Sequence, residues 1–196
     1  MMLGRRRHRA SAGRQNLFLV SQGFDNGNWT KLNATITPNT IAAPDGQATA
    51  DAMIEAVTAT VTHVISQSVA KVAAQIPVTF SIYAKDKGRT LELSIQGAGG
   101  TNGLTWRVDP ATGTTVQAAA PYGAGWTVTG AIITPAPNGF YRFEVSAVSD
   151  ATASAKGQAV LLSGASNTYT GDGVSGVYLW GAQLEFGPVA TGYIAT

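Results

Sequence analysis

The chain has 196 residues, enough for one domain with a sizeable core. It contains no cysteine, which excludes disulfides, thiolate metal sites and cysteine nucleophiles. Only 12% of the residues are charged, against the usual ~25%, so Ser, Thr, Asn, Gln and the 23 glycines must supply most of the polar surface. This balance is typical of all-β proteins with many tight turns.

The net charge of +2 conceals an asymmetry along the chain. Five arginines precede the first acidic residue, Asp25, which leaves eight basic against 11 acidic residues in the remainder. This pattern predicts an extended basic arm over residues 1–15 and a mildly acidic folded domain over residues 16–196. The arginines of the arm are Arg5, Arg6, Arg7, Arg9 and Arg14.

Three roles fit this arm: docking on an acidic protein surface, contact with nucleic-acid phosphates, or a solvated tail without a partner. Arginine suits the first two because its guanidinium binds a carboxylate or phosphate through two hydrogen bonds. No aromatic residue interleaves with the arginines, which weakens a single-strand-binding role. The arm lacks the apolar segment of a signal peptide, and no apolar run reaches the ~20 residues of a membrane span, so we expect no membrane insertion.

The first half of the domain contains clear strands and one ambiguous stretch. The apolar run 16–20 and the partly alternating run 29–37 predict strands, and the Pro-Asp-Gly sequence at 44–46 predicts a turn. Residues 52–75 are rich in alanine, which favours helix, but 57–65 are dominated by β-branched residues. We expect a strand up to about Ser68, with a short helical turn near 69–74 as the alternative at its end.

The second half alternates short apolar strands with glycine- and proline-rich turns. We expect strands at about 78–84, 90–96, 105–108, 114–118, 126–134, 141–148, 158–162 and 177–184. The Gly-Ala-Gly-Gly sequence at 97–100 indicates a turn, because no helix follows it to bind a phosphate. Many short strands at regular spacing predict an all-β fold, an antiparallel two-sheet jelly-roll sandwich.

Several segments, in order, resemble the jelly-roll domain of tailed-phage virion proteins. The most informative is the closing strand, Trp180-Gly181-Ala182-Gln183-Leu184-Glu185, after a glycine-rich turn. The others are 16–17 with 24–26 and 29–31, 43–46 with 49–51, 80–85, 109–113 and 138–142. Together they cover nearly the whole chain after the arm.

The resemblance implies a small, exposed subunit of a phage particle, such as a head decoration, head fibre or tail component. The basic arm would anchor it to capsid or tail proteins, and a homo-oligomer, by analogy a trimer, is expected. The family is also similar to carbohydrate-binding modules. The alternative function is therefore a glycan-binding adhesion module that recognises a host surface glycan.

Aromatic residues are the candidates for glycan contact. Trp29 and Trp180 lie beside apolar runs and are expected in the core. Trp106, Tyr122 and Trp126 lie in or beside glycine- and proline-rich segments, where an exposed ring could stack on a sugar. Packing across a sheet or a subunit interface is the alternative for these three.

Four loop carboxylates, Asp25, Asp51, Asp172 and Glu185, are candidates for a structural calcium ion, since similar sandwiches often carry one and Ca²⁺ prefers oxygen ligands. A turn-forming role is the alternative for each. No other cofactor is implied.

Enzyme signals are weak. His8 lies in the arm, His63 lies in a predicted strand, and no nucleophile elbow or phosphate-binding loop is present. We therefore expect a binding or structural protein rather than an enzyme.

Overall fold

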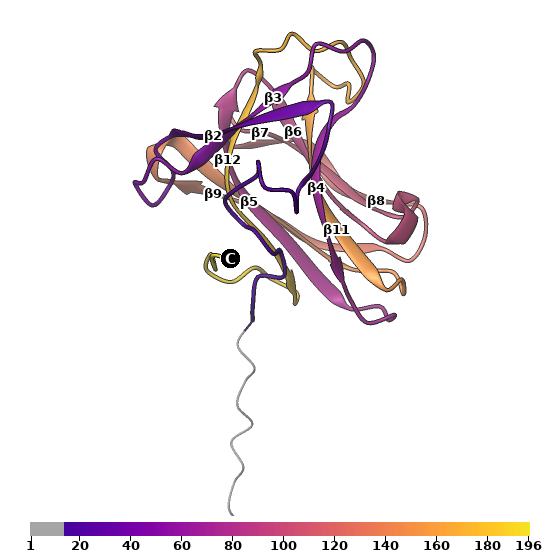
Figure 1. The fold of residues 1–196 in the computed structure, drawn as a ribbon. Coiled ribbons are helices and arrows are strands. Elements are labelled where there is room, and N and C mark those ends of the chain that lie inside the picture. Colours follow the sequence, from indigo (N-terminus) through magenta and orange to yellow (C-terminus); the bar gives the residue numbers. More distant parts are fainter. Residues whose placement is uncertain (1–13) are drawn as a thin grey trace, which may run out of the picture.

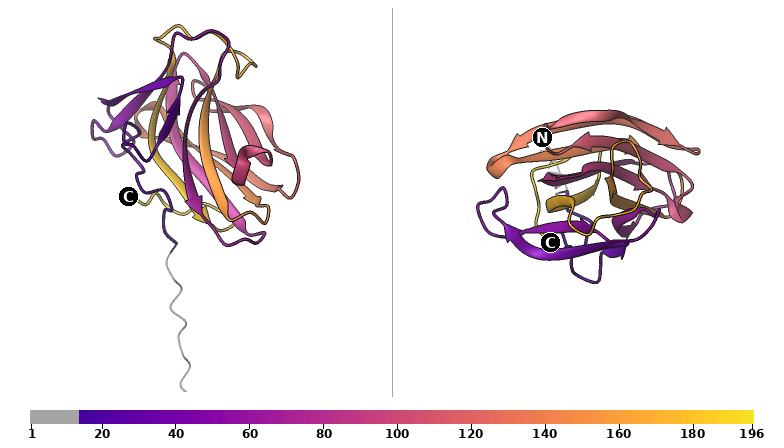
Figure 2. Two further views of the ribbon diagram at one scale, coloured as in Figure 1. Left: turned by 45° about the vertical axis from the view of Figure 1, so that its right-hand side comes forward. Right: turned by 90° about the horizontal axis from the view of Figure 1, so that it is seen from above.

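The computed structural model describes residues 14–196 (Figure 1), which form two six-stranded sheets with antiparallel pairing throughout. The first sheet has the order β1-β4-β11-β6-β7-β8 and the second has the order β2-β3-β12-β5-β10-β9. The chain passes repeatedly from one sheet to the other. Seen from above in Figure 2, the strands enclose a common interior. This confirms the predicted all-β jelly-roll sandwich; residues 1–13 of the arm lie outside the described residues.

The strands have the following bounds. The first sheet contains β1 (Thr30–Leu32), β4 (His63–Ala70), β11 (Ser154–Leu162), β6 (Thr90–Gln96), β7 (Gly103–Asp109) and β8 (Thr114–Tyr122). The second contains β2 (Ala34–Ile41), β3 (Ala50–Glu55), β12 (Gly176–Phe186), β5 (Pro77–Lys87), β10 (Phe140–Val148) and β9 (Thr127–Ala136). Single 3₁₀ turns lie at Ala98–Gly100 and Pro137–Gly139.

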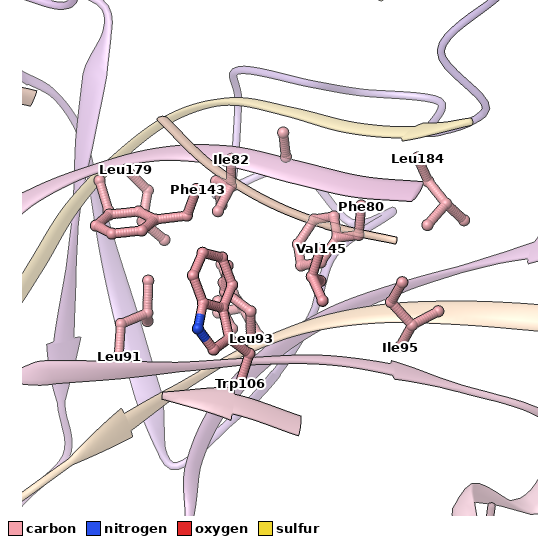
Figure 3. Close-up of a cluster of buried hydrophobic side chains, with 14 of the residues drawn as sticks. Phe80, Ile82, Leu91, Leu93, Ile95, Trp106, Phe143, Val145, Leu179 and Leu184 are labelled. Carbon is pink, nitrogen blue, oxygen red and sulfur yellow. The ribbon is translucent and has the colours of Figure 1, made fainter. Parts of the chain in front are cut away.

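The core lies between the sheets and follows the two-residue period of the strands. Leu91, Leu93 and Ile95 of β6 point inward toward Phe80 and Ile82 of β5, and all are fully buried (Figure 3). Trp106 lies within this cluster and contacts residues of both sheets.

Trp106 of β7 packs edge-on against Phe143 of β10, with 6.0 Å between ring centroids. Its indole nitrogen donates to the Thr115 hydroxyl on the neighbouring β8. One side chain therefore ties two strands of the first sheet to the second sheet.

The predicted strand at 16–20 is wrong. This segment has no strand geometry and makes a single ladder-type bond, from the Leu17 amide to the Leu184 carbonyl. The Asn16 side chain instead donates to the carbonyls of Ala182 and Ile194, and Phe18 turns into the core. Side-chain anchoring thus replaces the backbone ladder that the apolar pattern suggested.

The predicted strand at 29–37 is two strands that belong to different sheets. Asn33, between β1 and β2, adopts the left-handed region (φ 51°), which asparagine tolerates better than most residues and which lets the chain change sheets. A strand boundary was also misplaced further on. Residues 57–60 form an exposed loop and β4 begins only at His63.

The alternative helical turn at 69–74 is absent from the structure, since β4 continues to Ala70 against β11. The alanine-rich stretch also contains β3, which was not predicted. Pairing of these segments with β11 and β12 outweighs the helix propensity of alanine.

Replacing Trp106 by alanine should lower the free energy of unfolding by about 3–5 kcal/mol, because a buried indole is exchanged for a cavity. Urea unfolding followed by circular dichroism would measure the change. Val116→Ala on the exposed surface of β8 is the control and should change stability by less than about 1 kcal/mol. Equal stability of Trp106→Ala and the wild type would contradict the packing described above.

Candidate functional site

Two of the three aromatic residues that were predicted to bind a glycan lie in the interior of the protein. Trp106 is 1% exposed and Trp126 is 6% exposed, and both belong to the main core. Their faces are therefore covered by protein, and the prediction that they form a sugar-stacking platform is wrong for these two. Their position beside glycine- and proline-rich segments suggested loops, but both side chains point between the sheets. Trp29 is a core residue, as expected.

The four predicted calcium ligands do not share a site, and three of them have separate structural roles. Asp51 is buried and accepts hydrogen bonds from the Phe24 and Asn39 amides; burial raises the pKa of its carboxyl. Asp172 accepts from the Ser175 and Val174 amides and from the Ser175 hydroxyl, and these bonds hold its pKa below the usual range.

Asp25 and Glu185, the other two predicted ligands, do not share a site either. Asp25 is exposed, and Glu185 is buried and accepts from the Thr191 amide and hydroxyl and from Gln183. Within residues 14–196, no group of three or more His, Asp or Glu side chains is arranged to hold a metal ion. The turn-forming alternative fits Asp172, and loop bracing fits Asp51 and Glu185.

Of the predicted anchoring arginines, only Arg14 belongs to the described residues; Arg5, Arg6, Arg7 and Arg9 lie outside them. The Arg14 guanidinium donates to the Val189 carbonyl and lies over Gly187. Gly187 in turn bonds to Pro77 at the start of β5. Arg14 therefore lies near the start of β5, whereas Arg89, just beyond the other end of β5, bonds to Asp172 of the loop 163–175. Figures 1 and 2 show the start of the described chain, in indigo, at the end of the sandwich opposite that loop.

A groove of about 370 Å³ crosses the outer face of the first sheet. Its floor is built by strand register, which aligns outward side chains of neighbouring strands in rows. The middle row contains only uncharged hydrogen-bonding side chains. It consists of Thr30, Ser66, Gln158, Ser94 and Thr105 on β1, β4, β11, β6 and β7. Thr30, Ser66 and Gln158 line the groove, and Ser94 and Thr105 continue the row beyond it.

The rows on either side differ in character. One is mainly apolar and runs from Leu32 through Val64 and Val160 to Glu92. The other places Lys156 beside Gln96, both of which line the groove. The groove thus offers amides, hydroxyls and one ammonium group above a partly apolar floor.

Tyr122, the third predicted aromatic, lies next to this groove. Gly103 faces outward in the row of Gln96 and has no side chain, so the Tyr122 ring crosses it and brings its hydroxyl toward Ser94 and Gln96. Burial raises the pKa of this phenol. The hydroxyls of Tyr122 and Ser94 are both buried, and neither makes a well-formed hydrogen bond. Protein therefore covers both hydroxyls, and the Tyr122 ring closes the sheet surface beside the groove.

An ion pair and a loop close one end of the groove. Glu92 is paired with Arg107 (Oε2 to Nε, 2.7 Å), and Arg107 also donates to the Ala165 carbonyl. The loop 163–175 contributes Asn167 to the groove wall. Because Glu92 is neutralised, the charge at this end is small.

A buried carboxylate holds this loop in place. Glu55 accepts two hydrogen bonds from Arg89, at 2.7 Å each, one from the Tyr169 hydroxyl and one from the Asp172 amide. Burial, followed by the bond to Glu55, raises the pKa of Tyr169. His63 packs against the Tyr169 ring and bonds to the Asn33 carbonyl, which fits the expected structural histidine.

A second pocket, of about 380 Å³, lies on the outer face of the second sheet and is lined by Tyr83, Trp180 and Tyr193. Trp180 is nearly buried, as expected, but it belongs to a separate cluster with Phe140 rather than to the main core. Sequence patterns missed both surfaces. Alternation around Trp180 was visible, but it did not reveal on which face of the sheet the ring lies.

No protein-family model matches the chain, and no curated protein matches it either. Three solved structures share part of its strand arrangement. A domain of tailspike protein 4 of bacteriophage CBA120, described as enzymatically active, has 15% identity and a TM-score of 0.46; the alignment covers 87% of this chain but only 20% of that one.

Within residues 14–196, no helix has the length and hydrophobicity to cross a bilayer.

The other two structures are of similar length to this chain. A candidate sugar-binding protein from Bacteroides thetaiotaomicron has 14% identity and a TM-score of 0.47, with 88% of this chain and 100% of that one covered. The carbohydrate-binding module TmCBM27, which recognises mannan, has 13% identity and a TM-score of 0.40, with 90% and 96% covered. At this distance the similarities carry no functional argument.

Replacing Glu55 by glutamine should destabilise the protein by roughly 3 kcal/mol, because Arg89 loses its charged partner and an amide NH₂ faces donor groups. The loop 163–175 should become sensitive to protease under native conditions. Chemical unfolding and limited proteolysis would measure both effects. Asp25→Asn, at an exposed carboxylate, is the matched control and should leave both unchanged; a resistant loop in Glu55→Gln would contradict the role assigned to Glu55.

Proposed function

We propose that this protein is a glycan-binding module and that the groove on the first sheet is its binding site. The observation that carries this proposal is a set of uncharged hydrogen-bonding side chains in register on neighbouring strands, Thr30, Ser66 and Gln158, that lines the groove. The strand residues that line the groove come from β1, β4, β11 and β6, and three strand intervals of ~4.8 Å give it a length of about 14 Å. That length suits an oligosaccharide of several sugars.

The chemistry of the groove matches that of a sugar chain. A sugar presents hydroxyl groups that both donate and accept, and Thr30, Ser66 and Gln158 can do the same. The Val64 and Val160 side chains supply an apolar strip for the C–H face of the rings. Since Glu92 is paired with Arg107, Lys156 is the one unbalanced charge among the described residues that line the groove. Mostly uncharged polar groups fit a neutral glycan, and the groove lining lacks the cluster of cations that a polyanionic glycan would require.

We propose a binding protein rather than a glycosidase. Cleavage of a glycosidic bond usually requires two carboxyl groups on opposite sides of it. Among the described residues that line the groove, Glu92 is the single carboxylate, and it is held by Arg107. This arrangement supports binding without turnover.

The resemblance to phage virion domains supports a more specific setting, which we propose as a second function. The protein would be a structural subunit on the surface of a tailed-phage particle, attached to capsid or tail proteins by its basic arm and assembled as a homo-oligomer. Arg14 favours this arrangement, because it places the start of the domain at the end opposite the loop 163–175 that borders the groove. An anchored module would then present the groove outward.

Gln158→Ala should weaken binding of neutral oligosaccharides by about tenfold, the equivalent of one or two lost hydrogen bonds. A glycan array would select the oligosaccharide, and calorimetry would measure its dissociation constant. Gln75→Ala, at an exposed glutamine that does not line the groove, is the control and should bind normally. A folded wild-type protein that binds no neutral oligosaccharide, or a Gln158→Ala variant of unchanged affinity, would exclude this site.

Removing residues 1–13 should leave a folded domain, because the contacts of Arg14 and Asn16 are retained, but should abolish attachment to the particle. Immunogold electron microscopy of particles from the source lysate, with antibody to residues 16–196, would measure attachment. Label on the head would indicate a decoration or head-fibre subunit, and label on the tail would indicate a tail component. Particles that carry no label, or that retain the truncated protein, would refute the anchored-subunit proposal.

A further inference from the structure

The aromatic pocket on the second sheet is built, like the groove, by register across neighbouring strands. The outward residues Trp180, Tyr83, Arg142 and Thr134 are directly paired on β12, β5, β10 and β9. They form one continuous row across four strands. All four line the pocket, so its floor is fixed by the sheet rather than by loops.

Three aromatic rings form one side of the pocket. The ring centroids of Tyr83 and Trp180 are 5.2 Å apart. The ring centroid of Tyr193, from the C-terminal segment, lies 4.5 Å from that of Trp180. The Tyr193 hydroxyl is hydrogen-bonded to Ser21, and the Trp180 indole donates to Thr49. Since bonds outside the pocket hold the rings, their orientation does not depend on a ligand.

Charged groups lie beside the rings. Arg142 stacks over Tyr83, with 5.5 Å between its guanidinium carbon and the ring centroid, and is paired with Glu144 at 3.3 Å. It also donates to the Ser81 hydroxyl and to the Thr191 carbonyl. The Arg142 side chain is only 11% exposed, and its Nε–H is buried without a hydrogen-bond partner.

An unpaired donor on a nearly buried guanidinium is costly, and a sheet face that only needed covering could be apolar. Rigid aromatic walls with a few convergent polar groups are instead the usual composition of a small-molecule pocket. The volume of about 380 Å³ has room for one or two sugar rings but not for a folded peptide.

We propose that this aromatic pocket binds a single saccharide unit, neutral or amino-substituted, independently of the groove. The flat faces of Tyr83 and Tyr193 match the apolar face of a pyranose, and Arg142, Thr134 and Asp45 match its hydroxyl edge. Two carboxylates, Asp45 and Glu144, against one guanidinium make the pocket net negative. The pocket therefore disfavours uronic and other acidic sugars and accepts an amino group.

The two sites cannot be occupied by the same short glycan. They lie on the outer faces of different sheets, and the buried core fills the space between those sheets. Sheets packed face to face are about 10 Å apart between backbones, before the outward side chains are added. A protein with both sites can hold two glycan segments at once and gains avidity on a surface coated with them.

The test uses the full-length protein and ¹⁵N-resolved indole signals. Methyl glycosides of glucose, galactose, mannose and glucosamine would be titrated, with methyl glucuronide as the acidic comparison. At least one neutral or amino glycoside should shift the Trp180 indole signal, identified with Trp180→Phe, and leave those of Trp29, Trp106 and Trp126 unmoved. The glucuronide should bind more weakly.

Tyr83→Leu, which keeps an apolar side chain, should weaken this binding at least tenfold while oligosaccharide binding in the groove stays unchanged. Gln158→Ala should weaken oligosaccharide binding in the groove and leave glycoside binding in the pocket unchanged, so each variant tests one site alone. The proposal is overturned if no glycoside moves the Trp180 signal, if the glucuronide binds best, or if Tyr83→Leu binds as well as wild type. It is also overturned if Gln158→Ala abolishes both kinds of binding.

Discussion

The core and both surfaces of this sandwich depend on one constraint: successive side chains of a strand point to opposite faces of the sheet. In β6, Leu91, Leu93 and Ile95 fill the interior, and Glu92 and Ser94 between them point to the outer face, where Glu92 lines the groove. A slip of one residue would place the groove residues in the core. The apolar packing that holds the sheets together therefore also fixes the positions of the hydrogen-bonding groups outside.

The chain has few charged residues, and several of its carboxylates have structural roles inside the protein. Glu55, Asp51 and Glu185 are buried and accept hydrogen bonds from backbone amides, and Glu55 is also paired with Arg89, so they brace loops instead of facing solvent. Recognition is then left to amides, hydroxyls and aromatic rings. Such groups suit uncharged partners, because amides and hydroxyls form directional hydrogen bonds without creating a strong electric field.

Elements with a local signal could be predicted from the sequence. The bounds of β6 were exact, and β10 differed by one residue, because alternation and adjacent turns define both. The segment 16–20 failed because its apolar side chains are held by Asn16 and not by a ladder. The sites could not be predicted: Ser94, Gln158 and Thr105 are distant in sequence and meet only through register. Trp106 and Trp180 show similar local patterns, yet one ring faces the core and the other the outside.

The two ends of the described chain are bonded to each other. The Asn16 side chain donates to Ile194, the Ser21 amide donates to the Thr196 carbonyl, and the Thr196 amide donates back to the Ser21 hydroxyl. Entry and exit of the polypeptide therefore lie side by side. The folded unit can be spliced into a surface loop of another protein through two short linkers, as a cassette whose strands and binding faces are left intact.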